Sequence, residues 1–72
     1  MGLMDIRRTV GGNVRTFREE RGLSQEELAF KAGLHRTYVS GVERGVRNPT
    51  ILVIERLAKA LNVPPDHLLK AK

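Results

Sequence analysis

The chain contains no cysteine and no tryptophan, and its other aromatic side chains are one tyrosine and two phenylalanines. Without cysteine, neither a disulfide nor a thiolate metal site can stabilise the fold, and a reducing compartment is permitted. No apolar run approaches the roughly 20 residues of a membrane span, and the N-terminal segment lacks the apolar centre of a signal peptide. We therefore expect a cytoplasmic protein that does not span a membrane.

Length and composition indicate one small, basic domain. No repeat, low-complexity tract or long linker interrupts the 72 residues, so we expect a single domain over residues 1–72, with residues 1–4 disordered. A core of this size supplies only about 3 to 5 kcal/mol, so pairing with a second copy would help. Lys and Arg total 13 against 8 Asp and Glu, giving a net charge of +5. This balance suits a polyanionic partner, either nucleic acid or an anionic membrane surface.

Two short apolar patterns flank Gly33 within the stretch Gln25–Arg44. Each repeats at helical spacing, so each predicts a short helix with one inward face. The inward positions are Leu28, Ala29 and Ala32 before the glycine, and Leu34, Val39 and Val42 after it. Gly33 suits the turn because a left-handed backbone costs little without a Cβ atom. Two short helices joined by such a turn make a helix-turn-helix, whose second helix can enter the DNA major groove.

From about Val10 to Leu69, the spacing of apolar positions and glycines resembles the bacterial and phage helix-turn-helix family of the Cro and repressor type, also called XRE-like. The ending NPTILVIERLAKALNVPPDHLL carries the resemblance beyond the two central helices. The resemblance implies an all-α fold, a compact five-helix lambda-repressor-like DNA-binding domain whose helix-turn-helix is formed by the second and third helices. Within the family, LHRTYVSGVERGVRN especially resembles the short controller proteins of restriction-modification systems.

A first helix is expected between Asp5, which can cap its start, and Gly22, which can end it. Its inward stripe consists of Ile6, Val10, Val14 and Phe17. Gly11 and Gly12 lie inside this helix, where each costs roughly 1 kcal/mol relative to alanine. Either a neighbouring helix packs so closely that it needs the missing side chains, or the helix starts near Asn13. We expect a continuous helix.

Ser24 and Glu27 have the spacing of a capping box, so the helix that follows Ser24 has a well-defined start. Gln25 lies in its first turn, where backbone N–H groups and the helix dipole favour an anion. In the resembled family the matching glutamine binds a DNA phosphate, which implies that role for Gln25. A glutamine that is merely solvated is the alternative.

The first turn of the third expected helix carries Arg36 and Thr37, and a recognition helix presents this part to base edges. Arginine can bind guanine O6 and N7 with two hydrogen bonds, and threonine can offer its hydroxyl or its methyl group to thymine. Ser40 lies one turn further on the same side. We expect these three side chains to contact bases, and Gly41 to let the backbone approach the groove.

Phosphate contacts are expected from residues in and around the two central helices. His35 opens the third helix, and a metal site is disfavoured there because no cysteine or metal-binding histidine spacing accompanies it. Tyr38 either lies beside the DNA backbone or packs sideways on the preceding helix. The expected phosphate contacts are Gln25, His35, Tyr38, Arg44, Arg47, Asn48 and Thr50, the last of which can also cap the fourth helix.

Glu43 is an acid in an otherwise basic helix, and a carboxylate that faced DNA would be unfavourable. The family resemblance implies another role, an inward ion pair between Arg18 of the first helix and Glu43. Removing one member of such a pair leaves a partly buried charge and costs about 3 to 5 kcal/mol. Two solvated charges are the alternative.

The fourth expected helix has an inward stripe and two further apolar residues. The stripe consists of Ile51, Ile54, Leu57, Ala58 and Leu61. Leu52 and Val53 fall outside it, which suggests a partner surface, although single exposed apolar residues are also normal. Leu68 and Leu69, in a short fifth helix, either return to the core or join that surface. We expect a homodimer interface formed by Leu52, Val53, Leu68 and Leu69.

The expected function is binding without chemistry: a sequence-specific transcriptional regulator that acts as a homodimer on an inverted repeat in double-stranded DNA. A restriction-modification controller is the preferred type, and a phage-type repressor or an antitoxin bound to a toxin protein is the alternative. RNA polymerase is a further partner if the protein activates transcription. An enzyme is not expected, because no nucleophile and base are suitably spaced. Nor do we expect a cofactor, a metal, a membrane partner or a small-molecule ligand.

Overall fold

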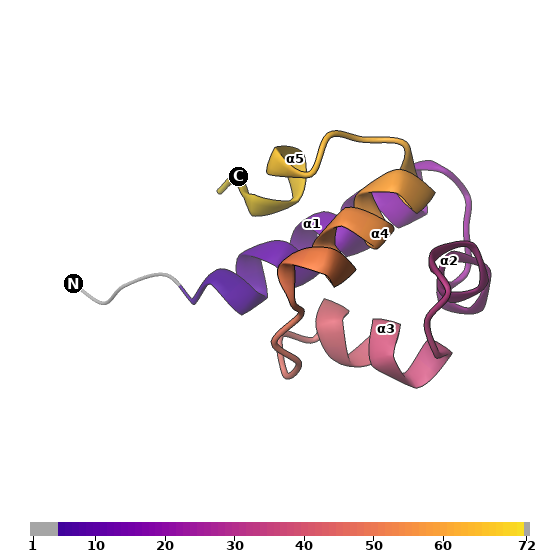
Figure 1. Ribbon diagram of the computed structural model, residues 1–72, viewed down its shortest axis with the longest axis horizontal. Helices are drawn as coiled ribbons and strands as arrows, with labels where there is room; N and C mark the ends of the chain where they lie inside the picture. The colour runs from indigo at the N-terminus through magenta and orange to yellow at the C-terminus, as the bar shows by residue number, and fades with distance from the viewer. Residues whose placement is uncertain (1–4, 72) are drawn as a thin grey trace.

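The computed structural model describes residues 5–71, which form five α-helices and no strand (Figure 1). The helices are α1 (Ile6–Glu20), α2 (Gln25–Ala32), α3 (Arg36–Glu43), α4 (Ile51–Leu61) and α5 (Asp66–Leu69). The predicted all-α, five-helix fold is therefore confirmed, with α2 and α3 forming the helix-turn-helix. The disorder expected for residues 1–4 lies outside the described residues.

Local sequence signals set where these helices begin and end. The Ser24 hydroxyl accepts a hydrogen bond from the Glu27 backbone N–H at 3.0 Å, and the Glu27 carboxylate accepts one from the Ser24 N–H at 2.8 Å. These two bonds form the predicted capping box at the start of α2. Gly33 ends α2 with φ of 70°, and Thr50 caps α4 by accepting from the Val53 N–H at 3.1 Å.

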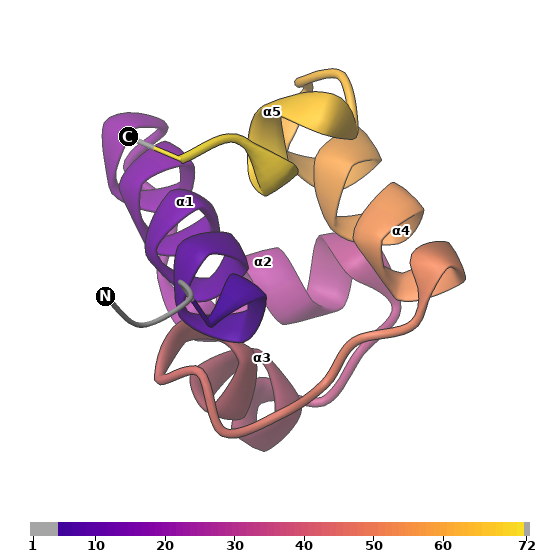
Figure 2. The same cartoon turned by 90° about the vertical axis from the view of Figure 1, so that its left-hand side faces the viewer.

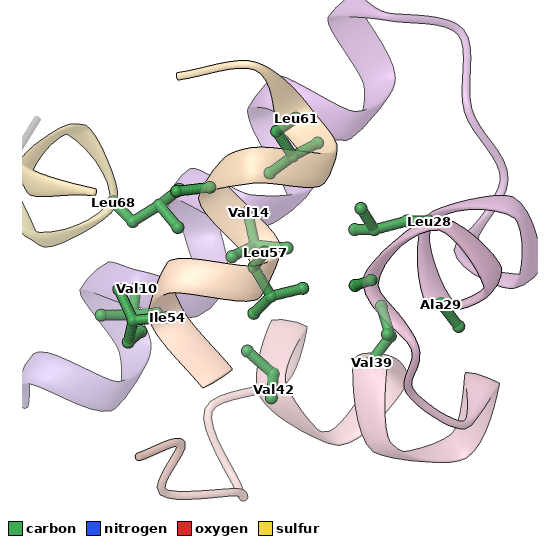
Figure 3. Packing of buried hydrophobic residues seen from close by; sticks show 12 residues of the cluster. Val10, Val14, Leu28, Ala29, Val39, Val42, Ile54, Leu57, Leu61 and Leu68 are labelled. Carbon is green, nitrogen blue, oxygen red and sulfur yellow. The ribbon is translucent and has the colours of Figure 1, made fainter. Parts of the chain in front are cut away.

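A single apolar cluster joins all five helices (Figure 3). Its buried members are Val10, Val14, Leu28, Ala29, Ala32, Val39, Val42, Ile54, Leu57, Ala58, Leu61 and Leu68. Helix α1 packs against α3, α4 and α5, while α2 packs against α3 and α4. Both ribbon views place α3 and α5 on opposite sides of the molecule (Figures 1 and 2). The core therefore holds α3 on one side of the fold, away from the C-terminal helix.

Helix α1 is continuous through its two glycines, as expected, and their surroundings differ. A Cβ atom at Gly11 would overlap the carbonyl oxygen of Val42 and lie 2.7 Å from that of Glu43, whereas one at Gly12 would meet nothing within 4 Å. Close approach of the C-terminal end of α3 therefore explains Gly11 but not Gly12. The sequence left open whether packing required these glycines. In the structure, packing requires the glycine at position 11 and does not require the one at position 12.

Asn13 connects α1 to the C-terminal segment. Its side chain is buried, and its Nδ2 donates to the carbonyl oxygens of Leu68 at 2.9 Å and Lys70 at 2.8 Å. The sequence analysis assigned Asn13 no such role. The two hydrogen bonds that this buried amide donates hold the short α5 against α1, compensating for the few residues with which α5 can pack.

Two positions differ from the predicted apolar faces of α4 and α5. Ile51 was expected inside but is 86% exposed, because the first turn of α4 borders an open groove and no neighbouring helix covers it. Leu68 was expected at a dimer interface but is completely buried, because the face of α5 that packs on α1 carries it into the core. Val53 is half-buried and packs against the core, while Leu52 and Leu69 are exposed. The prediction was therefore wrong for Ile51 and for Leu68.

Candidate DNA-binding surface

The outer side of α3 and the start of α2 together form a shallow polar cavity of about 260 Å³. Its lining residues are Gln25, Arg36, Thr37, Ser40 and Arg44. Arg36, Thr37 and Arg44 are exposed, and Gln25 and Ser40 are half-buried. The structure thus brings together all three predicted base-contacting residues and two of the predicted phosphate contacts.

Helix α3 is anchored by its opposite side. Val39 and Val42 are 0% and 1% exposed and point into the apolar cluster, which turns the polar side outward (Figure 3). His35 precedes the helix, and its carbonyl oxygen accepts from the N–H groups of Tyr38 at 3.0 Å and Val39 at 3.1 Å. The exposed His35 side chain makes no capping hydrogen bond, so its imidazole is available at the surface.

A buried polar network lies directly behind this cavity. Glu43 Oε2 accepts from Arg18 Nε at 2.6 Å, and Glu43 Oε1 accepts from Arg18 Nη2 at 3.1 Å. The side chains are 12% exposed for Arg18 and 3% for Glu43, and the hydrogen bond that Arg18 donates to Glu43 raises the pKa of Arg18. The ion pair implied by the family resemblance is therefore present. Arg18 also donates to the Leu23 carbonyl oxygen at 2.8 Å, which fastens the segment between α1 and α2.

Gln25 is also part of this network, which the sequence did not predict. Its Nε2 donates to Glu43 Oε1 at 3.0 Å, across 18 positions of sequence. Ionised carboxylates are acceptors only, so the amide nitrogen of Gln25 must face Glu43. The first residue of α2 is thereby tied to the last residue of α3.

Arg47 folds back from the loop after α3 and lies across that helix. A Cβ atom at Gly41 would lie 2.6 Å from Arg47 Cγ, and the Arg47 guanidinium carbon is 5.9 Å from the centre of the Tyr38 ring. Gly41 therefore makes room for an arginine side chain, a use of this glycine that the sequence did not predict. Tyr38 itself is half-buried and packs against the apolar cluster, as one of the two alternatives proposed.

Asn48 and Thr50, two other expected phosphate contacts, are exposed but do not line the polar cavity. Asn48 borders an apolar hollow on another side of the molecule, and the Thr50 hydroxyl accepts the capping bond of α4. A threonine hydroxyl keeps its own proton when it accepts, so Thr50 can still donate to a second partner. Gln25 and Arg44 therefore line the polar cavity, whereas Asn48 and Thr50 lie outside it.

The apolar hollow, which we call the apolar groove, has a volume of about 360 Å³. Four exposed side chains contribute to it: Ile6, Ile51, Leu52 and Leu69. Large apolar side chains gathered at one surface are typical of a protein interface. The sequence pointed to Leu52 and Leu69, but it missed Ile6 and Ile51 because both fit the inward stripe of their helices.

Residues 5–71 contain no group of three or more His, Asp or Glu side chains placed to hold a metal ion. Within the same part of the chain, every helix is too short or too polar to cross a bilayer.

The histidine His67 stacks on Phe17 with ring centres 6.3 Å apart, so it packs against α1.

Comparison with known proteins gives a consistent result. The helix-turn-helix family matches residues 14–68. The chain is 50% identical over 66 residues to the control protein C.SmaI of Serratia marcescens, covering 92% of this chain and 79% of the relative. It is 48% identical over 66 residues to the control protein C.BamHI of Bacillus amyloliquefaciens, covering 90% and 82%. It also matches the crystal structure of the restriction-modification controller protein C.AhdI from Aeromonas hydrophila, with a TM-score of 0.84, 48% identity and coverage of 86% of this chain and 94% of that chain.

Proposed function

We propose that this chain, which belongs to the helix-turn-helix family of DNA-binding transcriptional regulators, binds an inverted-repeat operator as a homodimer and controls a restriction-modification operon. The family consists of regulators and not of enzymes, and the chain is similar to restriction-modification control proteins. Because a regulator of this kind acts by binding chromosomal DNA, we place the protein in the cytoplasm.

The observation that carries the proposal is the convergence of Gln25, Arg36, Thr37, Ser40 and Arg44 on one outward surface of α2 and α3. Arg36 and Thr37, in the first turn of α3, bind base edges in the major groove, and Ser40 extends this contact by one turn. Gln25 and Arg44, at the start of α2 and the end of α3, bind the phosphates on either side.

The remaining proposed phosphate contacts come from residues that do not line this cavity. His35 stands before α3, Arg47 lies across it beside Tyr38, and Asn48 and Thr50 precede α4. In our proposal they fix the position of the protein on the duplex without reading its sequence. Together with the net charge of +5, these contacts make the affinity fall steeply as salt concentration rises.

The apolar groove is the proposed homodimer interface. Leu52 and Leu69 remain from the set expected from sequence, whereas Leu68 is in the core. The exposed Ile6 and Ile51 join them in the groove. Val53, another member of the expected set, is half-buried and packs against the apolar cluster. A helix-turn-helix dimer bound to an inverted repeat has its two copies of α3 in successive major grooves about 34 to 36 Å apart. Binding over a promoter represses transcription, and contact between the bound dimer and RNA polymerase activates it.

Selection of bound duplexes from a random pool tests the proposal. We expect one preferred sequence with two-fold symmetry and half-sites about 10 base pairs apart, centre to centre. A preferred sequence without symmetry would contradict the homodimer while leaving DNA recognition intact. Retention of all sequences alike would contradict sequence-specific recognition itself.

A further inference from the structure

The carboxylate of Glu43 is the meeting point of three helices. It receives two hydrogen bonds from Arg18 of α1 and one from Gln25 of α2, while Glu43 itself ends α3. The carboxylate is 3% exposed, so its position is fixed by these donors and water has little access to it. Its negative charge is matched by the Arg18 guanidinium, and it therefore does not repel a nearby phosphate as a free acid would.

The Gln25 amide has two N–H groups and one oxygen, and Glu43 determines how they are arranged. The hydrogen bond from Gln25 Nε2 to Glu43 Oε1 uses one N–H and holds the nitrogen, not the oxygen, at that end of the amide. The second N–H belongs to the same nitrogen and is left for another acceptor. Gln25 lines the polar cavity together with Arg36 and Ser40, so that acceptor can come from outside the protein.

We propose that Glu43 is a positioning residue for DNA binding, which orients the Gln25 amide so that its second N–H donates to a phosphate oxygen. The inference rests on the proposed phosphate contact of Gln25. The inference gives the Arg18–Glu43 ion pair a second role. The pair links α1 to α3, and through Glu43 it also orients the Gln25 side chain of α2 before DNA binds. The sequence separation of 18 residues between Gln25 and Glu43 means that only the folded helix-turn-helix can create this arrangement.

The physical advantage is that the glutamine side chain is already ordered before DNA arrives. A free glutamine would lose side-chain rotamer freedom on binding, and its amide could present the oxygen, which repels phosphate, as easily as the nitrogen. Losing this preset orientation should weaken binding by roughly 3- to 10-fold, the cost of immobilising one flexible side chain. Because phosphate is present at every sequence, the loss should be the same on specific and random duplexes.

A double-mutant cycle on DNA affinity tests the proposal, with Gln25→Ala, Glu43→Gln and the two combined. Glu43→Gln keeps the size of the side chain and an oxygen acceptor for Arg18, but its new amide can donate to Gln25 and turn the Gln25 oxygen toward the phosphate. We expect each single variant to lose about 3- to 10-fold in affinity and the double variant to lose no more than either alone. Equal further loss from Gln25→Ala in both backgrounds would overturn the positioning role.

Two other outcomes have separate meanings. If Gln25→Ala costs nothing in the otherwise unchanged protein, the proposed phosphate contact fails, and the positioning role fails with it. If Gln25→Ala weakens binding and Glu43→Gln does not, the phosphate contact stands and the positioning role is wrong. Arg18→Lys is the matched control, because it loosens the ion pair and retains the Glu43 carboxylate; we expect it to lower thermal stability without removing the effect of Gln25→Ala.

A measurement on the unmodified chain avoids any dependence on how well the variants fold. Gln25 is the single glutamine of the sequence, so its side-chain NH₂ signals are readily assigned by NMR. In the free protein we expect one of its two amide protons to exchange slowly with solvent, because that proton is bonded to Glu43. Adding duplex DNA should then protect the other proton. Rapid exchange of both protons in the free protein would overturn the proposal.

Discussion

Gly11 of α1 lies directly against the carbonyl oxygen of Val42 near the end of α3. The two helices approach so closely that their backbones touch, which only a residue without a side chain permits. Because α3 carries the proposed base-contacting side chains, this contact helps to fix the angle at which α3 stands out from the core. A small residue in α1 thus influences the geometry of the DNA-binding surface without facing DNA.

Gly11→Ala should therefore destabilise the protein, by about 1 to 3 kcal/mol or more, because neither backbone carbonyl can move away freely. Gly12→Ala is the matched control: it meets nothing within 4 Å and should stabilise α1 by up to about 1 kcal/mol through helix propensity. Thermal or urea unfolding measures both. Equal effects of the two substitutions would show that the contact between α1 and α3 is looser than described.

Gly41→Ala should displace Arg47 from α3, because the added Cβ atom would lie 2.6 Å from Arg47 Cγ. We expect DNA affinity to fall by about 1 kcal/mol on all sequences alike, the typical worth of one hydrogen bond. The fold should persist, since the displaced group is a surface side chain. In an Arg47→Ala background, Gly41→Ala should have no further effect on affinity; a persistent loss there would mean that Gly41 itself approaches the DNA.

Leu52→Glu should shift the protein from dimer to monomer in sedimentation experiments, because it places a charge in the apolar groove. Phe30→Glu is the control, since Phe30 is also exposed, at 87%, but belongs to α2 and lies outside this groove. A dimer that survives Leu52→Glu and dissociates with Phe30→Glu would place the interface on α2 instead.

The capping box of α2 predicts a pH dependence. The Glu27 pKa is lowered from its ordinary value, first because the carboxylate accepts a hydrogen bond from the Ser24 backbone N–H. A lowered pKa in the folded state means that Glu27 stabilises the fold above its ordinary pKa and loses that effect as pH falls through the lowered value. Glu27→Gln should therefore reduce the melting temperature near neutral pH and change it much less in strong acid. A difference that stays constant across this range would contradict the assignment.

Features set by neighbouring residues could be predicted from sequence. The capping pair Ser24 and Glu27, the turn at Gly33 and the cap at Thr50 each depend on a few adjacent positions, and each is present. The convergence of Arg36, Thr37 and Ser40 could also be predicted from sequence, because helical spacing alone places them on one side of α3.

Features that depend on how helices meet could not be predicted in the same way. Ile51 fits the inward stripe of α4, but whether a neighbour covers the first turn depends on tertiary packing, and none does. The space at Gly41 is filled by a side chain six positions later, and Gln25 finds its partner 18 positions away. Periodicity indicates which side of a helix is apolar, and it does not identify what that side touches.

In the proposed complex, α3 reads base sequence through Arg36, which affinity measurements with Arg36→Ala can test. The variant and the unmodified protein would each be titrated with the selected duplex and with a random duplex at the same salt concentration. We expect Arg36→Ala to lose about 1 to 3 kcal/mol on the selected duplex and much less on the random one, whereas Arg44→Ala should weaken both equally. Equal losses on both duplexes with Arg36→Ala would reduce Arg36 to a phosphate contact and rule out base reading by this side chain.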